Sequence, residues 1–218
     1  MNCLVIAATP IEIAPFLTYL KKEKKIKYEI DVLITGIGLT AATYALLNQI
    51  NIKKPAFIIQ AGVGGCFDIN IKLGTVVAIK KETIADQSVV ELKTLKTLFD
   101  LQLLPQNKIP FSNGWLVNSN DILRKIKLKK VTGISVNEIT TDKKKVKLYR
   151  DRFKPVIESM EGAALHYVSL MEKIPFLQIR SVSNYIAERN KQKWNMKEAV
   201  ENLNKDLISI LIQLNPSF

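Results

Sequence analysis

The sequence predicts an α/β fold with three α/β/α layers around a twisted central sheet that is mixed but mostly parallel. Two observations support this prediction. Continuous apolar runs, typical of strands covered on both faces, alternate along the chain with segments of helical periodicity. In addition, 218 residues with 47% hydrophobic side chains are enough to bury one complete core. No repeat or linker interrupts the pattern, so residues 1–218 are expected to form a single domain.

The N-terminal half contains four expected strands and two expected helices. The strands are residues 2–8, 28–35, 56–61 and 75–85. The first helix is expected to start at Thr9, because Thr9 suits the N-cap, Pro10 the first helical position, and Glu12 completes an S/T-x-x-E capping box. The second helix is expected over residues 41–50, and glycine-rich turns are expected at residues 36–38 and 62–65.

The C-terminal half is expected to contain three more strands and three helices. The strands are residues 131–136, 156–159 and 176–183, and the helices are residues 141–152, about 162–173 and 197–214. The last helix carries Val200, Leu203 and Leu207 on one face, at helical spacing. Residues 87–110 show no clear period, and a short helix with an excursion from the domain is expected there.

The formal net charge of +12 is spread along the chain rather than massed in one arm. The clusters are lysine pairs at positions 21–22, 24–25, 53–54 and 80–81 and a triplet at 143–145, all near the ends of expected elements. Nucleic-acid binding requires clustered basic residues combined with aromatic or groove-reading elements. The distribution therefore favours a solvated lysine-rich surface, and no nucleic-acid partner is expected.

The cysteine content and the chain ends bear on the compartment. Cys3 and Cys66 lie in apolar or glycine-rich runs, and two cysteines do not make a disulfide framework, so both are expected to be reduced thiols. The N-terminus lacks the basic region and cleavage site of a secretory signal, and no apolar run has the length of a membrane span. A cytoplasmic protein with no membrane partner is expected.

Candidate ligand-binding residues follow the expected strands at their carboxyl ends, where open α/β sheets bind ligands. In chain order they are Glu12, Gly36, Gly38, Gly62, Gly64, Gly65, Asn137, Thr140, Met160, Glu161 and Asn184. Each has a structural alternative, since Glu12 suits a helix cap, the glycines suit turns and Asn184 suits a loop. The set contains carboxylates and amides but no histidine and no metal-binding cluster, so no metal site is expected.

Several motifs in the sequence resemble those of the purine nucleoside phosphorylase/nucleosidase superfamily. They are IAATPIEI, TGIGLTAA, AGVGGCFD, LGTVV, SMEGAA and RSVSN. Within the superfamily, the segments ADQS, TGISVNEIT, SNYIAERNKQKWN and NLN most resemble the futalosine hydrolases of menaquinone biosynthesis. The resemblance implies a nucleoside phosphorylase-like fold, a purine nucleoside substrate, no metal or organic cofactor, and a homodimer.

The resemblance also implies roles for individual residues. Glu12 would hold and deprotonate the attacking water, and Glu161 would accept hydrogen bonds from the ribose hydroxyls. Met160 would line the sugar and the base. The remaining implied substrate-binding residues are Gly62, Val63 and Gly64, whose backbone would face sugar and water, and Asn137, Ile139, Thr140 and Arg189. Arg189, Lys191 and Trp194 are all candidates to bind the carboxyphenyl group of futalosine.

Asn184, the second implied catalytic residue, bears on which base leaves. Adenine-cleaving members of the superfamily carry Asp at this position. A protonated carboxyl matches the N7 acceptor and N6 donor of adenine, whereas an amide NH₂ matches the N7 and O6 acceptors of a 6-oxopurine. Asn184 therefore predicts a hypoxanthine-type base.

The leading hypothesis is hydrolysis of the N-ribosidic bond of futalosine to hypoxanthine and dehypoxanthinylfutalosine. One alternative is a nucleosidase or phosphorylase acting on inosine, methylthioadenosine or S-adenosylhomocysteine. A different class is a basic nucleotide-binding protein on the same fold without catalytic activity, whose binding would weaken steeply with salt.

Overall fold

The computed structural model describes residues 2–23, 25–188 and 190–214. Its strands are β1 (Asn2–Ala7), β2 (Glu29–Ile34), β3 (Phe57–Cys66), β4 (Val76–Glu82), β5 (Ser88–Glu91), β6 (Thr94–Thr97), β7 (Leu116–Val117), β8 (Lys129–Ser135), β9 (Ile157–Ser159) and β10 (Phe176–Tyr185). Its helices are α1 (Ala14–Lys22), α2 (Leu39–Ile52), α3 (Asp121–Lys125), α4 (Lys143–Phe153), α5 (Gly162–Met171), a 3₁₀ turn η1 (Lys191–Lys193) and α6 (Met196–Gln213).

The central sheet is mixed and mostly parallel, which confirms the predicted fold class. Its strand order is β10-β4-β8-β9-β3-β1-β2, and β10 also pairs with β3. Strands β3, β10, β4, β8 and β9 therefore form a closed ring, from which β1 and β2 extend as an open flank. The β1–β2, β1–β3, β3–β10, β4–β8 and β8–β9 pairs are parallel, and the β4–β10, β3–β9 and β4–β7 pairs are antiparallel.

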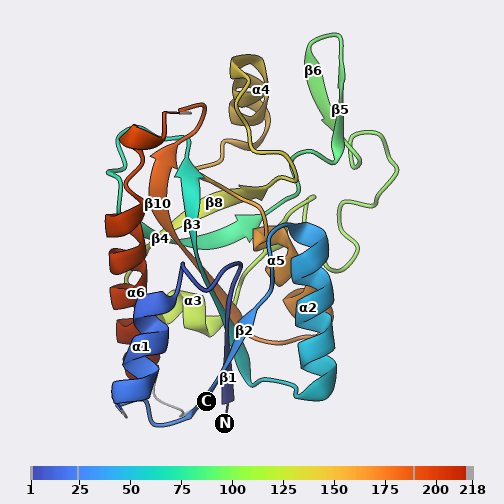
Figure 1. The fold of residues 1–218 in the computed structure, drawn as a ribbon. Coiled ribbons are helices and arrows are strands. Elements are labelled where there is room, and N and C mark those ends of the chain that lie inside the picture. Colours follow the sequence, from blue (N-terminus) through green and yellow to red (C-terminus); the bar gives the residue numbers. More distant parts are fainter. Residues whose placement is uncertain (1, 24, 189, 215–218) are drawn as a thin grey trace.

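Helices cover both faces of the open part of the sheet, with α1 and α6 on one side and α2 and α5 on the other (Figure 1). Strand β1 shows why both faces are needed, because successive side chains of a strand point to opposite faces. Cys3 and Val5 belong to the core beneath α1 and α6, whereas Leu4 and Ile6 belong to the core beneath α2 and α5. The continuous apolar run at the N-terminus is thus explained by burial on both sides.

Three expectations about local structure are wrong. The first helix starts at Ala14 rather than at Thr9, because residues 9–13 form a turn and the first turn of α1 is held by a side chain from α6. The glycines at positions 62–65 form no turn, since β3 runs through them to Cys66 and pairs there with β9 and β10. In place of the helix expected within residues 87–110 there is a hairpin, β5–β6.

The β5–β6 hairpin projects from the body of the molecule beside α4 (Figure 1). Its two connecting residues, Leu92 and Lys93, both have positive φ, of 48° and 66°. Such turns normally carry Asn or Gly. The usual sequence signal for a hairpin is therefore missing, which explains why the segment was not recognised.

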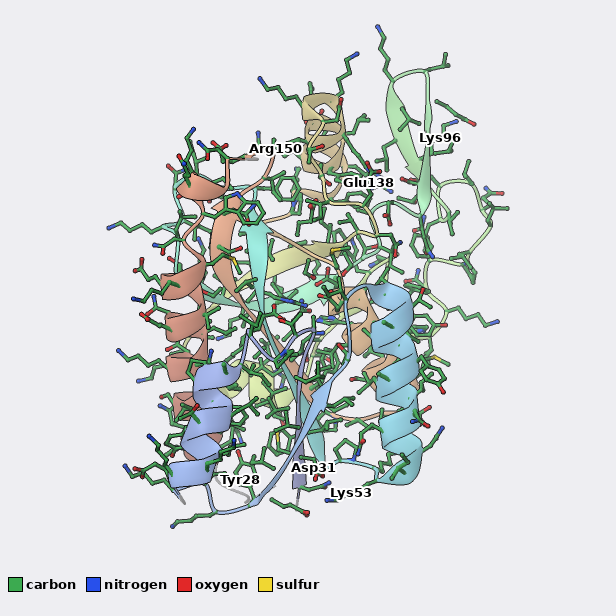
Figure 2. The ribbon with its side chains drawn as sticks, viewed as in Figure 1. Tyr28, Asp31, Lys53, Lys96, Glu138 and Arg150 are labelled. Atoms are coloured by element: carbon green, nitrogen blue, oxygen red, sulfur yellow. The ribbon has the colours of Figure 1, made fainter. Side chains whose placement is uncertain are left out.

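Surface charges are distributed over distant parts of the molecule. Figure 2 shows Lys53 beside Asp31 at one end of the sheet, with Lys96 and Arg150 near the other end. Lys53 lies 2.8 Å from a carboxylate oxygen of Asp31, and Lys96 lies 2.7 Å from one of Glu91. Within the described ranges, no helix is both long and apolar enough to cross a bilayer.

Candidate active site

A cavity of about 290 Å³ opens at the carboxyl ends of β1, β3, β9 and β10, close to the size range typical of small-molecule sites. Its wall consists of Ala8, Thr9, Glu12, Ile37, Val63, Gly64, Gly65, Ile139, Glu158, Ser159, Met160, Glu161, Ser183, Asn184, Ile186, Trp194 and Met196. The structure thus brings together nine of the predicted residues, namely Glu12, Val63, Gly64, Gly65, Ile139, Met160, Glu161, Asn184 and Trp194. The segments involved are far apart in sequence, and the parallel strands make them neighbours.

Glu12 lies on the turn between β1 and α1 with its carboxylate fixed on both oxygens. Its Oε1 accepts a hydrogen bond of 3.0 Å from the Val63 amide, and its Oε2 accepts bonds of 3.1 Å and 3.3 Å from the amide and hydroxyl of Thr9. The residue is 8% exposed. A carboxylate has about four acceptor positions, so these three bonds orient Glu12 and leave it able to accept a proton.

Glu161 lies at the start of α5, and its buried carboxylate is paired with Arg180. The Gly38 amide donates to Glu161 Oε1 at 3.0 Å, and Arg180 Nη2 lies 3.6 Å from Glu161 Oε2. Arg180 is 1% exposed and also donates to Gln60 Oε1 at 3.1 Å and to the Val63 carbonyl at 3.3 Å. The guanidinium compensates a negative charge that would be costly to bury alone.

Gly62 provides the space in which Arg180 and Glu12 approach each other. A Cβ atom on Gly62 would lie 2.3 Å from Arg180 Nη1 and 3.0 Å from Glu12 Oε1. Its backbone is extended within β3, so the glycine serves close packing rather than a turn. Gly62 itself is not part of the cavity wall, and it acts on the site through these two side chains.

Asn184 follows a bulge in β10 and is part of the cavity wall. Its Oδ1 accepts a hydrogen bond of 2.8 Å from the Ser183 hydroxyl, and its Nδ2 donates to the Tyr185 carbonyl at 3.2 Å. The Tyr185 carbonyl can only accept, so its contact identifies the nitrogen side of the amide. An amide nitrogen carries two hydrogens, so Asn184 keeps a second N–H with which to bind an acceptor.

The rest of the wall is largely apolar, and sequence reasoning missed Ile37, Ile186 and Met196 in it. Its apolar residues are Ile37, Val63, Ile139, Met160, Ile186, Trp194 and Met196. Ile37 is 62% exposed and lies between Gly36 and Gly38. An isoleucine within a glycine turn is a sequence signal that could have identified it as a wall residue. Trp194 is held by a 3.0 Å hydrogen bond from Nε1 to the Glu188 carbonyl. An apolar wall with few polar groups is the usual design of a small-molecule site.

The other predicted substrate-binding residues lie outside the wall. Asn137 donates its backbone amide to Asp86 at 2.6 Å and is exposed. Thr140 is buried and donates its amide to Glu158 Oε1 at 3.0 Å. Arg189 and the side chain of Lys191 lie outside the described residues. Glu158, which sequence reasoning missed, is the link between Thr140 and the cavity, and burial raises the pKa of its carboxyl group.

A second group of buried polar side chains lies behind Glu161, away from the cavity wall. Glu82 is fully buried, and its Oε1 accepts a 3.2 Å hydrogen bond from the Ser135 hydroxyl. Burial raises the pKa of Glu82 to about 8, which the nearby Arg180 opposes only in part. A Cβ on Gly133 or Gly162 would lie 2.5 Å or 2.7 Å from Glu82 Oε2. The two glycines therefore make room for the buried carboxyl group of Glu82.

Among the described residues, no group of three His, Cys, Asp or Glu side chains is placed to hold a metal ion. The chemistry available at the cavity is instead that of an oriented carboxylate, a charge-compensated buried carboxylate and an amide donor. Such a set can bind hydroxyl groups, orient a water molecule and hold a heterocyclic base. The fold and the site together are those of an α/β protein that binds a small molecule at the carboxyl ends of its strands.

Residues 5–212 match the phosphorylase superfamily, and the chain belongs to that superfamily. A 5′-methylthioadenosine/S-adenosylhomocysteine nucleosidase of Buchnera aphidicola is 28% identical over 72% of the chain and 67% of the relative. A futalosine hydrolase of Thermus thermophilus is 24% identical over 82% of the chain and 80% of the relative. The structure of futalosine hydrolase from Helicobacter pylori covers 98% of both chains with a TM-score of 0.78 and 20% identity, which shows a common fold. Nucleosidases with both names thus stand among the relatives.

Proposed function

We propose that the protein is a purine nucleosidase that hydrolyses the N-ribosidic bond of futalosine and releases hypoxanthine. The observation that carries the proposal is the convergence of Glu12, Glu161 and Asn184 on one cavity of suitable size. The hydrolytic class agrees with the names of the relatives in the superfamily. The choice of base rests on the amide of Asn184.

Cleavage of an N-ribosidic bond passes through a transition state with positive charge on the sugar ring, as in other glycosyl transfers. Glu161 would bind the ribose hydroxyls and place its negative charge near the developing cation. The carboxylate of Glu12, oriented by Val63 and Thr9, would take a proton from the attacking water. General-base help of this kind is typically worth about 10²- to 10⁴-fold in rate.

Water is favoured over phosphate as the nucleophile. No lysine or arginine occurs among the described residues of the cavity wall. The nearby Arg180 is already engaged by Glu161, Gln60 and the Val63 carbonyl. A phosphate dianion would therefore meet no available cation in this part of the site, and recognition of phosphate normally requires one.

The base preference follows from the hydrogen-bond pattern of Asn184. Its free N–H can donate to N7 or O6 of a 6-oxopurine, both of which are acceptors. The exocyclic amino group of adenine is a hydrogen-bond donor. If it faced the amide NH₂ of Asn184, two donors would oppose each other and one of them would be left unpaired. Asn184 therefore supports hypoxanthine as the leaving base.

A methylthioadenosine- or S-adenosylhomocysteine-type substrate is the second candidate. The 28% identical relative carries that name, and the apolar residues Ile37, Ile139 and Met196 in the wall would suit an alkylthio group. Futalosine instead carries a carboxyphenyl group, for which Trp194 offers an aromatic surface. The cation for its carboxylate is proposed to be Arg189 or Lys191. A non-catalytic nucleotide-binding role is the third candidate.

Replacing Asn184 by Asp tests the base assignment. Asn184→Asp is expected to lower kcat/KM for futalosine by about tenfold to a hundredfold, because a carboxylate would face the O6 acceptor. The ratio of aminofutalosine to futalosine cleavage should rise in the same variant. Both rates are measured by chromatography of the released base.

Asn190→Asp is the matched control, since Asn190 is exposed in the same segment and uses its Oδ1 to accept from the Gln192 amide at 3.0 Å. This variant should leave the substrate ratio unchanged. An unchanged ratio in Asn184→Asp would contradict the role of Asn184 in choosing the base.

We further propose that the enzyme is a cytoplasmic homodimer. Apolar side chains on α2 and the β5–β6 hairpin are exposed in the single chain and available for such a contact, including Tyr44, Ile52 and Leu92. The buried free thiols of Cys3 and Cys66 suit a reducing compartment. Light scattering that returns the mass of one chain at micromolar concentration would contradict the dimer.

A further inference from the structure

Asn204, in the third turn of α6, joins that helix to the segment that carries Glu12. It is 1% exposed, and its side chain contacts main-chain atoms almost 200 residues away. Its Oδ1 accepts from the Phe16 amide at 3.0 Å, and its Nδ2 donates to the Glu12 carbonyl at 2.8 Å and to the Val200 carbonyl at 2.6 Å. Both hydrogens and the oxygen of the amide are therefore in use.

These contacts explain how the turn before α1 is held. The helix begins at Ala14, and its N-cap residue, Ile13, has no side chain that can accept a hydrogen bond. The first amides of a helix lack partners within the helix. Asn204 supplies one of these partners from another helix and at the same time fixes the Glu12 carbonyl.

The backbone and the side chain of Glu12 are thus held independently. Thr9 and Val63 bind the two carboxylate oxygens, and Asn204 binds the main-chain carbonyl. Only a side chain of this length that carries both a donor and an acceptor can bridge the Glu12 carbonyl and the Phe16 amide. Asp has no donor when ionised, and an apolar residue has neither group.

Helix α6 also contributes to the wall of the cavity. Met196, its first residue, lines the cavity, and Trp194 lies just before it. The same helix therefore carries part of the cavity wall and the clamp on Glu12. A helix with this double contact sets the distance between the water-activating carboxylate and the bound substrate.

We infer that Asn204 is a positioning residue for catalysis, which acts by holding the Glu12 segment against the cavity. The inference rests on the proposed function, because it requires that Glu12 act on the water. A displacement of about 1 Å at a catalytic group can cost two orders of magnitude in rate. Loss of the clamp should therefore reduce kcat more than substrate binding, since Asn204 is not part of the cavity wall.

The test is Asn204→Asp, which keeps the size and the acceptor but removes the donor to the Glu12 carbonyl. We expect kcat to fall by about tenfold to a hundredfold with KM within about threefold of wild type. Asn202→Asp is the matched control, because Asn202 is on the same helix and donates to the Gly74 carbonyl at 3.0 Å, away from Glu12. Its kcat should stay within about twofold of wild type.

A double-mutant cycle separates positioning from a general loss of structure. In a Glu12→Gln background, Asn204→Asp should cause little further loss, because the group that it positions is already gone. Each rate is divided by the concentration of folded protein, which is measured by circular dichroism. If Asn204→Asp does not fold, Asn204→Ser is used for the same test. The serine hydroxyl is too short to bridge both main-chain groups, so the same fall in kcat is expected.

An unchanged kcat in a folded Asn204 variant, with active wild type, would overturn the inference and leave the proposed function intact. An equal loss in the wild-type and Glu12→Gln backgrounds would also overturn it, because Asn204 would then act on the fold alone. Wild-type protein that releases no base from any nucleoside would overturn the proposed function and the positioning role together.

Discussion

Glu12→Gln is expected to lower kcat for base release by about 10²- to 10⁴-fold. The amide keeps the size of the side chain and one acceptor for the Val63 amide, but it cannot take a proton from water. The free energy of unfolding should fall by about 1–3 kcal/mol, since Oε2 accepts from both the amide and the hydroxyl of Thr9 and an NH₂ group in its place would face the Thr9 amide donor to donor. Single-turnover kinetics and urea unfolding measure the two quantities.

The alternative role of Glu12 makes the opposite prediction for kcat. A carboxylate that only stabilises the turn would cost about 0.5–2 kcal/mol of stability when replaced and leave kcat unchanged. Glu82→Gln is a suitable control for activity, because Glu82 is a buried carboxyl group outside the cavity wall. If Glu12→Gln retains wild-type kcat, Glu12 is not the general base.

Glu82→Gln is expected to stabilise the protein at neutral and alkaline pH. The pKa of Glu82 is raised from 4.5 to about 8 by burial. At a pH between these two pKa values, the carboxyl group of Glu82 is ionised in the unfolded chain but keeps its proton in the folded protein. This group therefore makes the free energy of unfolding fall as pH rises. Glutamine resembles the neutral acid and removes the effect. The gain should be near zero below pH 4.5 and about 3 kcal/mol at pH 7.

The measurement is urea unfolding of both proteins from pH 5 to pH 8. His166 acts in the opposite sense, because burial lowers its pKa from 6.5 to about 4. Its contribution to the free energy of unfolding is therefore lost as pH falls from 6.5 to about 4. Since His166 is present in both proteins, the difference between them isolates Glu82. A difference that does not change with pH would show that Glu82 is charged in the folded protein.

The sequence was sufficient to predict that several distant residues meet at one edge of the sheet. Parallel strands place their carboxyl ends together, so the residues that follow them, such as Glu12, Glu161 and Asn184, were expected to meet. The apolar runs of β1 and β3 predicted strands buried on both faces, and the structure confirms both. These features follow from local patterns and from one general rule of α/β sheets.

The features that could not be predicted depend on contacts between distant segments. The ring of strands closes only because β3 continues through Gly62, Gly64 and Gly65, and glycines in isolation suggest a turn. Arg180 pairs with Glu161, and Asn204 donates a hydrogen bond to the Glu12 carbonyl from a helix far away in the sequence. Neither the hydrophobic periodicity nor the secondary-structure propensity of a short segment predicts contacts of this kind.

The central claim is that this site hydrolyses a 6-oxopurine nucleoside, and the direct test is base release from a panel with and without phosphate. The panel contains futalosine, aminofutalosine, inosine, methylthioadenosine and S-adenosylhomocysteine. The account predicts hypoxanthine from futalosine at a rate that phosphate does not change, and little adenine from the amino substrates. Adenine release from methylthioadenosine or S-adenosylhomocysteine at a higher rate than hypoxanthine from futalosine would contradict it.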